Sequence, residues 1–446
     1  MKSIISILLC ISVFIKAQTG TFTELSYSCA DNVSRPYILY TPKGIDKAKS
    51  YPLVIYLHGS ISAPVIKKNP LDYMKRSPLL KWADEGKFYL MFSYGQKGAT
   101  WFDKVGTQMV LGEMNNVVKQ FKVNTDKIFL SGFSDGGSGV MYMAMNNPFP
   151  FAGFIAMNGS LSVANKAGES AVFSENINNK PLYIINTDGD MLYPITQIRP
   201  TIDYLKSIDR NVVYSEPKGN HEMSYIDAEI PVLTSFVNQN SLTPTLSWSW
   251  ETAVPQQDFV QGIRINEIDT LQMPKNWQKP YHLKVFNDKA DFGVSYDYSY
   301  QGNDGLKVKG FKNDSATAKK MGVKPGDIIV MMGKDSITSP YTPYIYAASK
   351  KAGDAASLTV LRDGKTQTLS GVFNKGFYYD VFKRNERKHY AKIQAQIERH
   401  TLSIQTSRVK ALEINFDDLK AFGIRKLFIN DKKIKTKTKG IQKITL

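Results

Sequence analysis

The sequence has little cysteine and no long apolar segment beyond its start. Only two cysteines, Cys10 and Cys29, occur among its 446 residues, which excludes a disulfide-rich scaffold and a zinc site built from cysteine. After residue 20 no apolar run approaches the roughly 20 residues that cross a bilayer, so no transmembrane segment is expected. A chain of this length, 42% apolar and 22% charged, is predicted to be globular with about three domains.

The N-terminus differs in character from the rest of the sequence. Lys2 is followed by a largely apolar block at 4–15. A charged start before an apolar block too short to span a membrane is typical of a secretory signal peptide, which we predict at 1–17. A buried N-terminal strand is the alternative. Removal of the signal peptide leaves Cys29 without a partner, and we expect a secreted or periplasmic protein.

Acidic residues are the scarcer charged class, because 40 Asp and Glu stand against 57 Lys and Arg, a formal net charge of +17. More than half of this excess lies in 376–446, where 17 basic residues accompany 7 acidic ones. Aromatic residues do not alternate with the lysines of 432–439, as the stacking platforms of single-strand binders require. We therefore predict a solvated basic strand and no nucleic-acid partner, with an acidic polymer or a membrane surface as the alternative.

Between residues 20 and 240, short apolar runs alternate with helical patterns. This alternation predicts βαβ units and a mostly parallel sheet covered on both faces, an α/β fold. Near residue 241 the pattern changes to alternating β-formers. The predicted units are an α/β domain at 20–240, a β-rich part at 241–290, an α+β unit at 291–375 and a basic β-rich part at 376–446. The strands expected in the first unit are 36–40, 53–57, 88–93, 127–130, 154–157, 182–185 and 212–214.

The pentad Gly132-Phe133-Ser134-Asp135-Gly136 carries the first chemical signal. It follows the predicted strand 127–130 and precedes a helical pattern at 137–147. In a G-x-S-x-G elbow the nucleophile lies on a strained strand-to-helix turn, and the flanking glycines allow close packing against neighbouring backbone. We therefore predict Ser134 as the nucleophile of a serine hydrolase.

A serine nucleophile needs a base and an acid that orients the base. The chain has five histidines, and His221 follows the predicted strand 212–214 in a loop. The acid is expected after the strand 182–185, where Asp188 and Asp190 compete. We favour Asp190, because Asp188 could instead close a turn onto its own backbone. The order serine, acid, histidine is the one that α/β-hydrolases use.

The loop after the predicted strand 53–57 begins with His58 and Gly59. In this kind of fold that loop supplies one backbone N–H to the developing oxyanion, and the residue after the nucleophile supplies the other. Ser60 and Asp135 are therefore the predicted oxyanion hole, and His58 is interpreted as a structural residue. This chemistry requires neither a metal nor an organic cofactor.

The segments 51–59 and 127–137 together resemble the α/β-hydrolase superfamily, and within it secreted esterases similar to polyhydroxybutyrate depolymerases and feruloyl esterases. The likeness covers about 20–240, although the cysteines common in the depolymerases are missing. The loops around Asp190 and His221 match the acid and histidine loops of that group. The resemblance implies hydrolysis of carboxylic esters, and prolyl-oligopeptidase-like peptidases share the same elbow.

A second resemblance is carried by three segments, 291–294 (Asp-Phe-Gly-Val), 305–311 and 321–329. They are similar to bacterial PDZ domains, in which a ligand strand adds to a sheet edge beside one helix. This resemblance implies that Phe292, Gly293 and Val294 hold a peptide or a protein C-terminus, with 344–351 as the facing helix. A PDZ fold used as a spacer is the alternative. The flanking β-rich parts are either halves of one β-sandwich or separate sheets.

These features predict an exported serine hydrolase that cleaves carboxylic esters of a small molecule or a polymer and uses the PDZ-like module to bind substrate or a partner. A serine peptidase with the same triad is one alternative. A binding protein whose hydrolase fold is catalytically idle is another, since fold does not imply function. The complete order of serine, acid and histidine favours an enzyme.

Overall fold

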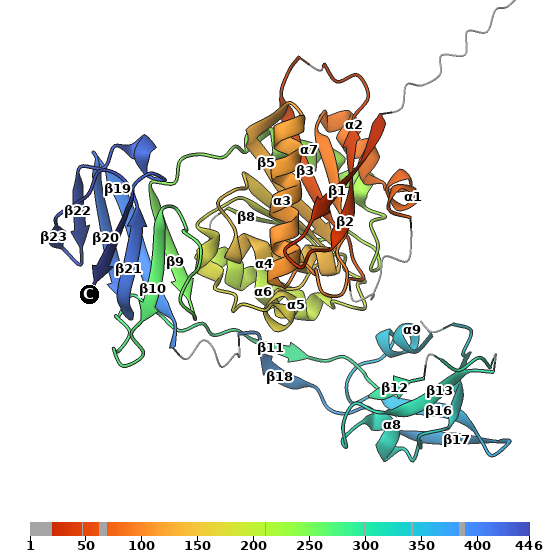
Figure 1. Ribbon diagram of the computed structural model, residues 1–446. Coiled ribbons are helices and arrows are strands. Elements are labelled where there is room, and N and C mark those ends of the chain that lie inside the picture. The colour runs from red at the N-terminus through yellow and green to blue at the C-terminus, as the bar shows by residue number, and fades with distance from the viewer. Residues whose placement is uncertain are drawn as a thin grey trace, which may run out of the picture.

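The computed structural model describes residues 20–46, 48–61, 69–209, 211–297, 299–302, 304–339, 342–382 and 389–446. The signal peptide predicted at 1–17, with Cys10, lies outside these residues. Figure 1 shows an α/β unit, a β-sandwich beside it, and a small inserted unit that a two-stranded ribbon joins to the rest. The α/β unit comprises 20–240 and the inserted unit 288–376.

The α/β unit is built on one eight-stranded sheet with the order β1-β2-β4-β3-β5-β6-β7-β8. β1 and β2 are antiparallel to their neighbours, whereas all pairs from β4 to β8 are parallel. Every residue of β4, β6 and β7 is buried, as expected of strands covered on both faces. The strands are β1 (Thr21–Ser28), β2 (Ser34–Thr41), β3 (Tyr51–Leu57), β4 (Tyr89–Ser93), β5 (Val123–Phe133), β6 (Gly153–Met157), β7 (Leu182–Ile185) and β8 (Val212–Ser215).

Helices cover both faces of this sheet. Alternate side chains of a strand point to opposite faces, so each central strand contributes to two cores. Leu53, Ile55 and Leu57 of β3 pack into one core with α3, α4, α5 and α6. Val54 and Tyr56 pack into the opposite core with α1, α2 and α7. The predicted α/β fold is thereby confirmed. The helices are α1 (Pro70–Lys75), α2 (Leu79–Gly86), α3 (Lys104–Gln120), α4 (Asp135–Asn146), α5 (Leu161–Ala167), α6 (Ile195–Ile208) and α7 (Ile226–Gln239).

Strands from before and after the inserted unit pair with each other in the sandwich. β9 lies antiparallel to β19, and β10 lies antiparallel to β21. A sheet of order β23-β22-β20-β19-β9 and a sheet of order β10-β21-β24 share one core, which includes Trp250, Ile265, Ile393 and Leu412. The strands are β9 (Ser247–Thr252), β10 (Ile263–Ile268), β19 (Ala391–Glu398), β20 (Thr401–Ser407), β21 (Val409–Asn415), β22 (Lys426–Ile429), β23 (Lys432–Ile434) and β24 (Ile441–Thr445).

The edge strand β9 is covered by the 3-10 helix η1 (Ser174–Ile177) of the α/β unit. The Asn176 amide donates to the Glu251 carbonyl at 3.0 Å and accepts from the Glu251 N–H at 2.8 Å. The buried Lys392 ammonium lies 2.6 Å from a Glu175 oxygen and 2.7 Å from a Glu251 oxygen. These contacts satisfy backbone polar groups on the edge of β9, which would otherwise be free to pair with another chain. They also join the sandwich to the α/β unit.

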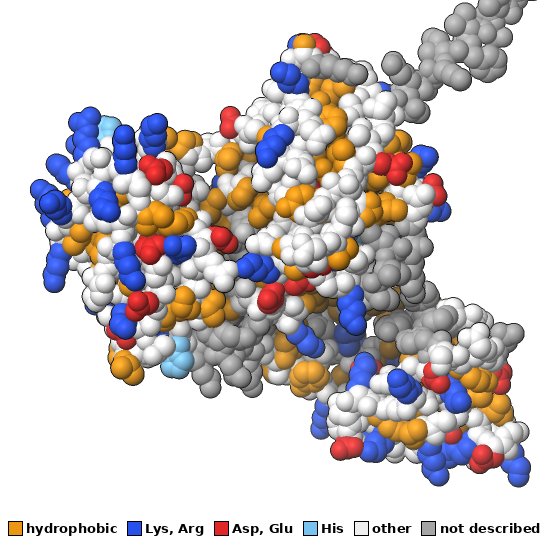
Figure 2. All heavy atoms as spheres, in the orientation of Figure 1, with side chains coloured by type: hydrophobic (Ala, Val, Ile, Leu, Met, Phe, Trp, Pro, Cys, Tyr) orange, Lys and Arg blue, Asp and Glu red, His pale blue; other side chains and the backbone are white. Residues whose placement is uncertain are grey.

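Basic side chains are spread over the exposed face of the sandwich in Figure 2. Lys432 and Lys433 are exposed on β23, which is the last strand of its sheet. Charged residues on an edge strand discourage pairing with other chains.

The inserted unit holds a five-stranded sheet of order β12-β13-β14-β16-β17, to which β15 is added. Its facing helix α9 spans Thr342–Ala348, not 344–351 as predicted. Pro343 is tolerated because it lies in the first turn, and Lys351 instead forms an isolated bridge with Lys289. The other elements are β12 (Val294–Tyr296), β13 (Leu306–Phe311), α8 (Thr317–Lys320), β14 (Ile328–Met332), β15 (Asp335–Ser336), β16 (Ala355–Arg362) and β17 (Lys365–Val372).

An antiparallel ribbon of β11 (Lys284–Asn287) and β18 (Phe377–Asp380) connects the inserted unit to the rest. The ribbon contacts α6, because the Tyr379 hydroxyl donates to the Gln197 side chain at 3.2 Å and Gln197 donates to Asn287 at 3.2 Å. The inserted unit is therefore fixed near the carboxyl ends of the α/β strands. None of the described helices is long and apolar enough to span a membrane.

Candidate active site

Ser134 lies on the sharp turn between β5, which ends at Phe133, and α4, which begins at Asp135. Its backbone has φ 60° and ψ −119°, a region that residues with a side chain rarely adopt. The turn can form because Gly136 has no side chain: a Cβ there would lie 1.9 Å from the Leu57 carbonyl oxygen. The elbow therefore directs the serine side chain away from the sheet edge.

The side chains of Ser134, His221 and Asp190 form one hydrogen-bonded chain. His221 Nε2 lies 2.7 Å from Ser134 Oγ, and His221 Nδ1 lies 2.7 Å from Asp190 Oδ2. The three residues follow β5, β8 and β7, and the carboxyl ends of these parallel strands meet at one edge of the sheet. The sheet order brings together residues that lie up to 87 positions apart in the sequence.

The Asp190 carboxylate is fully buried and held on both oxygens. Its Oδ1 accepts from the backbone N–H groups of Leu192 and Tyr193, each at 2.9 Å, and its Oδ2 accepts from Asn158 at 2.8 Å as well as facing His221. Burial by itself raises the pKa of Asp190, but hydrogen bonds from His221 and Asn158 outweigh it and the pKa is lowered. The carboxylate therefore stays ionised while its orientation is fixed.

Asn158 and Tyr225 extend this chain, and the sequence interpretation missed both. The Tyr225 hydroxyl donates to Asn158 Oδ1 at 2.8 Å, and Asn158 Nδ2 donates to both Asp190 and Thr187 at 2.8 Å. Asn158 has φ 44°, a left-handed conformation that asparagine tolerates. The sequence did contain one signal for Asn158. It directly follows the predicted strand 154–157, at the edge of the sheet where functional residues gather.

Asp188, the competing acid, lies elsewhere in the same loop. Its Oδ1 accepts from the backbone N–H of Gly219 at 3.1 Å, and its own N–H donates to the Pro217 carbonyl at 3.0 Å. Asp188 therefore ties the acid loop to the histidine loop, whereas the sequence suggested a bond within its own turn.

The predicted oxyanion donors both lie beside Ser134. Gly59 is so close that a Cβ there would lie 2.9 Å from the Ser134 Cβ, and Ser60 follows with φ 57°. Asp135 is the first residue of α4, and its carboxylate accepts from the Ile61 N–H at 3.1 Å. This bond joins the two loops that carry the predicted donors. The direction of the two N–H groups toward an oxyanion stays a prediction.

Aromatic rings line the surroundings of His58. The centroid of its ring lies 6.3 Å from that of Tyr73, 5.5 Å from Tyr94 and 5.4 Å from Trp101. Its Nδ1 lies 2.6 Å from the Gly59 carbonyl. Burial lowers the pKa of His58, which favours the neutral ring, and its structural role stays a prediction.

Two more rings flank the imidazole of His221. The ring of Phe133 is 5.0 Å from it and that of Tyr193 is 5.4 Å from it, centroid to centroid. Burial raises the pKa of Tyr193 to about 12, so its hydroxyl remains protonated and can donate a hydrogen bond. Within the described part of the chain, no group of three or more His, Cys, Asp or Glu residues could hold a metal ion.

Comparison with known proteins bears on the inserted unit. Residues 290–370 match the family model of the PDZ domain. The inserted unit is a PDZ domain. The chain also matches the serine protease Do-like HtrB of Bacillus subtilis (strain 168), with 27% identity over 158 residues, which are 35% of this chain and 31% of that protein. It thus spans less than a third of that relative's length.

Among solved structures, the fluorophosphonate-binding serine hydrolase F of Staphylococcus aureus is 16% identical, with 49% of this chain and 99% of that chain covered and a TM-score of 0.40. A ferulic acid esterase is 17% identical, with 50% and 99% covered and a TM-score of 0.40. An acylaminoacyl peptidase of Pyrococcus horikoshii is 14% identical, with 52% and 44% covered and a TM-score of 0.42. The sheet order and the elbow give the α/β unit of this chain the α/β-hydrolase fold.

The three residues predicted to hold a peptide lie at the edge of the PDZ domain. Phe292 is 3% exposed and its ring stacks on that of Tyr346 at 5.9 Å. Gly293 has φ 70°, and Val294 begins the edge strand β12. The structure does not bring these residues into contact with Ser134 or His221, but they line the same pocket as Asp190.

Proposed function

We propose that the chain is a serine hydrolase that cleaves carboxylic esters, with Ser134, His221 and Asp190 as its catalytic triad. The observation that carries this proposal is the pair of 2.7 Å contacts that link Ser134 Oγ to His221 and His221 to Asp190. This geometry allows nucleophile, base and orienting acid to act in sequence. The strained backbone of Ser134 supports the same assignment, because such strain collects at functional sites.

In the proposed reaction, Ser134 Oγ attacks the ester carbonyl while His221 Nε2 takes the serine proton. The backbone N–H groups of Ser60 and Asp135 stabilise the oxyanion, and collapse of the intermediate expels the alcohol, which His221 protonates. Water then hydrolyses the acyl-enzyme by the same steps. Because Asp190 is held ionised, it fixes the imidazole tautomer and stabilises the imidazolium.

Active-site labelling tests the proposal directly. A fluorophosphonate probe should react with the wild-type chain and not with the Ser134→Ala variant, and p-nitrophenyl acetate should be hydrolysed by the wild type alone. A folded wild-type protein that neither labels nor hydrolyses the ester would show that the hydrolase fold is idle. Labelling accompanied by cleavage of peptide substrates, and not of esters, would point to a peptidase with the same triad.

We also propose that the chain is exported and that its PDZ domain binds a peptide or a protein C-terminus. The charged and apolar start at 1–17 supports export, and the match at 290–370 supports peptide binding. Mass spectrometry of the protein recovered outside the cytoplasm tests the first point. A mature N-terminus that still carries Met1 would contradict removal of a signal peptide.

A further inference from the structure

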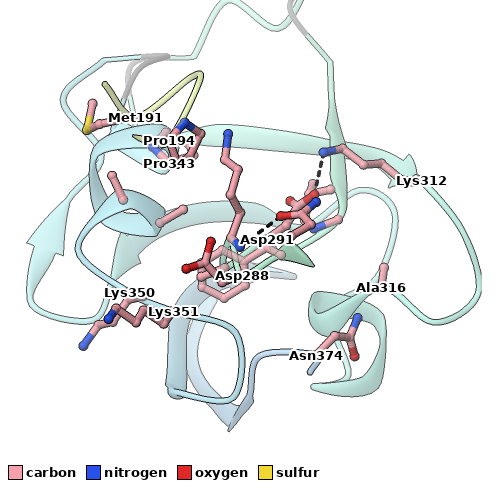
Figure 3. A pocket seen from close by; sticks show the side chains of 18 of the residues that line it. Met191, Pro194, Asp288, Asp291, Lys312, Ala316, Pro343, Lys350, Lys351 and Asn374 are labelled. Atoms are coloured by element: carbon pink, nitrogen blue, oxygen red, sulfur yellow. Dashed lines mark hydrogen bonds and ion pairs between the residues drawn. The ribbon is translucent and has the colours of Figure 1, made fainter. Parts of the chain in front are cut away.

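A pocket of about 1240 Å³ lies between the acid loop of the α/β unit and the PDZ domain. The α/β unit contributes 188–191 and 194–196, and the PDZ side contributes 287–296 together with part of α9. In Figure 3, Met191 and Pro194 lie at the same end of the pocket as Pro343 of α9. The pocket is therefore a composite of both units and not a groove of the PDZ domain alone.

The PDZ wall of this pocket offers a sheet edge. β12 is the terminal strand of its sheet and, among the described strands, pairs with β13 only. Its residues 294–296 line the pocket, and Pro343, Ala347 and Ala348 of α9 line it as well. An extended peptide can add to such an edge through main-chain hydrogen bonds and place alternate side chains against the small apolar residues of the helix.

The charge of the lining favours an anionic occupant. Two of the four acidic groups are engaged by cations or by the triad: the Asp291 carboxylate lies 2.7 Å from Lys312, and Asp190 faces His221. A wall with more lysines than aspartates attracts acidic side chains and disfavours basic ones. The lining lysines are Lys289, Lys309, Lys312, Lys320, Lys350, Lys351 and Lys375, and the lining aspartates are Asp188, Asp190, Asp288 and Asp291.

Direct contacts hold the two walls together. Lys289 Nζ donates to the Leu192 carbonyl at 3.2 Å, and the Thr196 hydroxyl donates to the Asp288 carboxylate at 3.1 Å. Both bonds start from residues 288–289, which precede β12. One reaches the loop after Asp190 and the other reaches α6. A peptide that lies along β12 is therefore brought against the acid loop.

We propose that this composite pocket binds the acidic segment of an extended polypeptide, which adds to β12 and contacts 188–191 of the α/β unit. The new element is the second wall, because the α/β unit then contributes to the affinity and the selectivity of the PDZ domain. The inference rests on the pocket and on the peptide binding proposed for the PDZ domain, and not on the proposed esterase activity. It is accordingly tested in protein that carries Ser134→Ala, so that a failed esterase proposal leaves the test intact.

The experiment measures fluorescence anisotropy of a fluorescein-labelled octapeptide that alternates Glu with Val and ends in Val. Lys309→Glu reverses a charge on the PDZ wall, and its matched control Lys334→Glu reverses one on an exposed lysine of the same domain outside the lining. Met191→Glu adds a charge to the α/β wall, and its control is Val232→Glu, an exposed residue of α7 in the same unit that lies outside the lining. Thermal melting of each variant checks that it folds.

We expect Lys309→Glu to raise the Kd about tenfold and Met191→Glu to raise it about threefold or more, with both controls within about twofold of the parent. Binding should weaken as salt is added. An unchanged Kd in Met191→Glu would overturn the proposal, because the contribution of the α/β wall is its new element. Equal binding of a peptide with Lys in place of Glu, full competition by a single-stranded oligonucleotide, or no saturable binding of the acidic peptide would overturn it.

Discussion

Ser134 is held in a backbone conformation that costs free energy, and its neighbours enforce it. The close approach of Gly136 to the Leu57 carbonyl leaves no room for the turn to relax. A non-glycine residue in such a region costs about 1 to 3 kcal/mol and persists only where packing determines it. The strain therefore comes from the scaffold, and removal of the serine hydroxyl should leave it unchanged.

The first prediction follows from this separation of scaffold and hydroxyl. Ser134→Ala should abolish ester turnover and fluorophosphonate labelling, because the nucleophilic oxygen is gone. The melting temperature should change little, since Ser134 belongs to neither apolar core of the α/β unit. Activity equal to that of the wild type would reject Ser134 as the nucleophile.

The second prediction separates the two aspartates of the acid loop. Asp190→Asn should lower kcat by roughly 10⁴, as when a triad acid can no longer select the imidazole tautomer. Asp188→Asn is the matched change two residues away, and it should cost far less because Asp188 bonds the Gly219 N–H and not the imidazole. Steady-state kinetics with p-nitrophenyl acetate gives both values. The reverse ranking would assign the acid role to Asp188.

The third prediction concerns Asn158 as a positioning residue. Asn158→Ala removes one donor to Asp190 Oδ2, and we expect kcat to fall about 10-fold to 100-fold with little change in KM, by analogy with the groups that orient metal-binding side chains. Tyr225→Phe should have a smaller effect of the same kind, because it leaves the bond between Asn158 and Asp190 in place.

A neighbouring asparagine supplies the control. Asn186 is also buried and donates to the Gly159 carbonyl at 3.1 Å, so Asn186→Ala breaks a comparable bond without touching Asp190. This variant should lose thermal stability and keep its kcat. If Asn158→Ala and Asn186→Ala lowered kcat equally, a general loss of packing, and not the orientation of Asp190, would be the cause.

The residues of the hydrogen-bonded chain differ in how far the sequence reveals them. Ser134 is marked by its glycines, and His221 and Asp190 follow strands in the order of the fold. Asn158 and Tyr225 belong to no short motif, because β6 and the start of α7 meet Asp190 only through the packing of the sheet. Contacts of this kind depend on three-dimensional neighbours that spacing along the chain does not encode.

At the scale of elements, the sequence reveals strands that are buried on both faces. β7 at Leu182–Ile185 has the predicted bounds, because a short continuous apolar run is typical of a strand buried on both faces. β1 and the ribbon strands β11 and β18 were not predicted, since each mixes exposed residues with partly or fully buried ones and none has a continuous buried run. Such strands are specified by their partners and not by their own composition.

The fourth prediction concerns a buried ion pair that joins strands of the PDZ domain. Arg362 at the end of β16 donates to both oxygens of Asp327 at 2.7 Å. Burial by itself raises the pKa of Asp327, but the Arg362 guanidinium and the Lys324 N–H outweigh it and the pKa is lowered. Asp327→Asn should lower the free energy of unfolding of the domain by about 2 kcal/mol at pH 7.

The lowered pKa also fixes the sign of the pH dependence. A carboxyl group whose folded pKa lies below its unfolded value of about 3.9 stabilises the fold above that pH and loses this contribution as the pH falls through the folded pKa. The difference between wild type and Asp327→Asn should therefore shrink below about pH 4. Calorimetry of the full chain measures it, with Asp335→Asn, an exposed carboxyl of β15, as control. A difference that is constant with pH would contradict the assignment.

At the scale of the whole molecule, the PDZ domain is an insertion between strands of one sandwich. β9 and β10 precede it in the chain and pair with β19 and β21, which follow it. The ribbon brings its two ends together, because Asn287 of β11 pairs with Phe377 of β18. The sequence left one sandwich and separate sheets open, since pairing over such a distance along the chain cannot be inferred from alternation alone.

The last prediction follows from this arrangement. Since the ends of the insertion are adjacent, replacement of 291–373 by a short Gly/Ser linker should leave a folded protein, as insertions at exposed sites are tolerated. Ser134, His221 and Asp190 all come from the α/β unit, so we expect hydrolysis of p-nitrophenyl acetate within about threefold of the wild-type kcat/KM. Binding of the acidic octapeptide should be lost at the same time, because β12 is removed. A variant that is soluble and folded but inactive on the small ester would show that the PDZ domain completes the active site, through the residues of 291–373 that line the same pocket as Asp190.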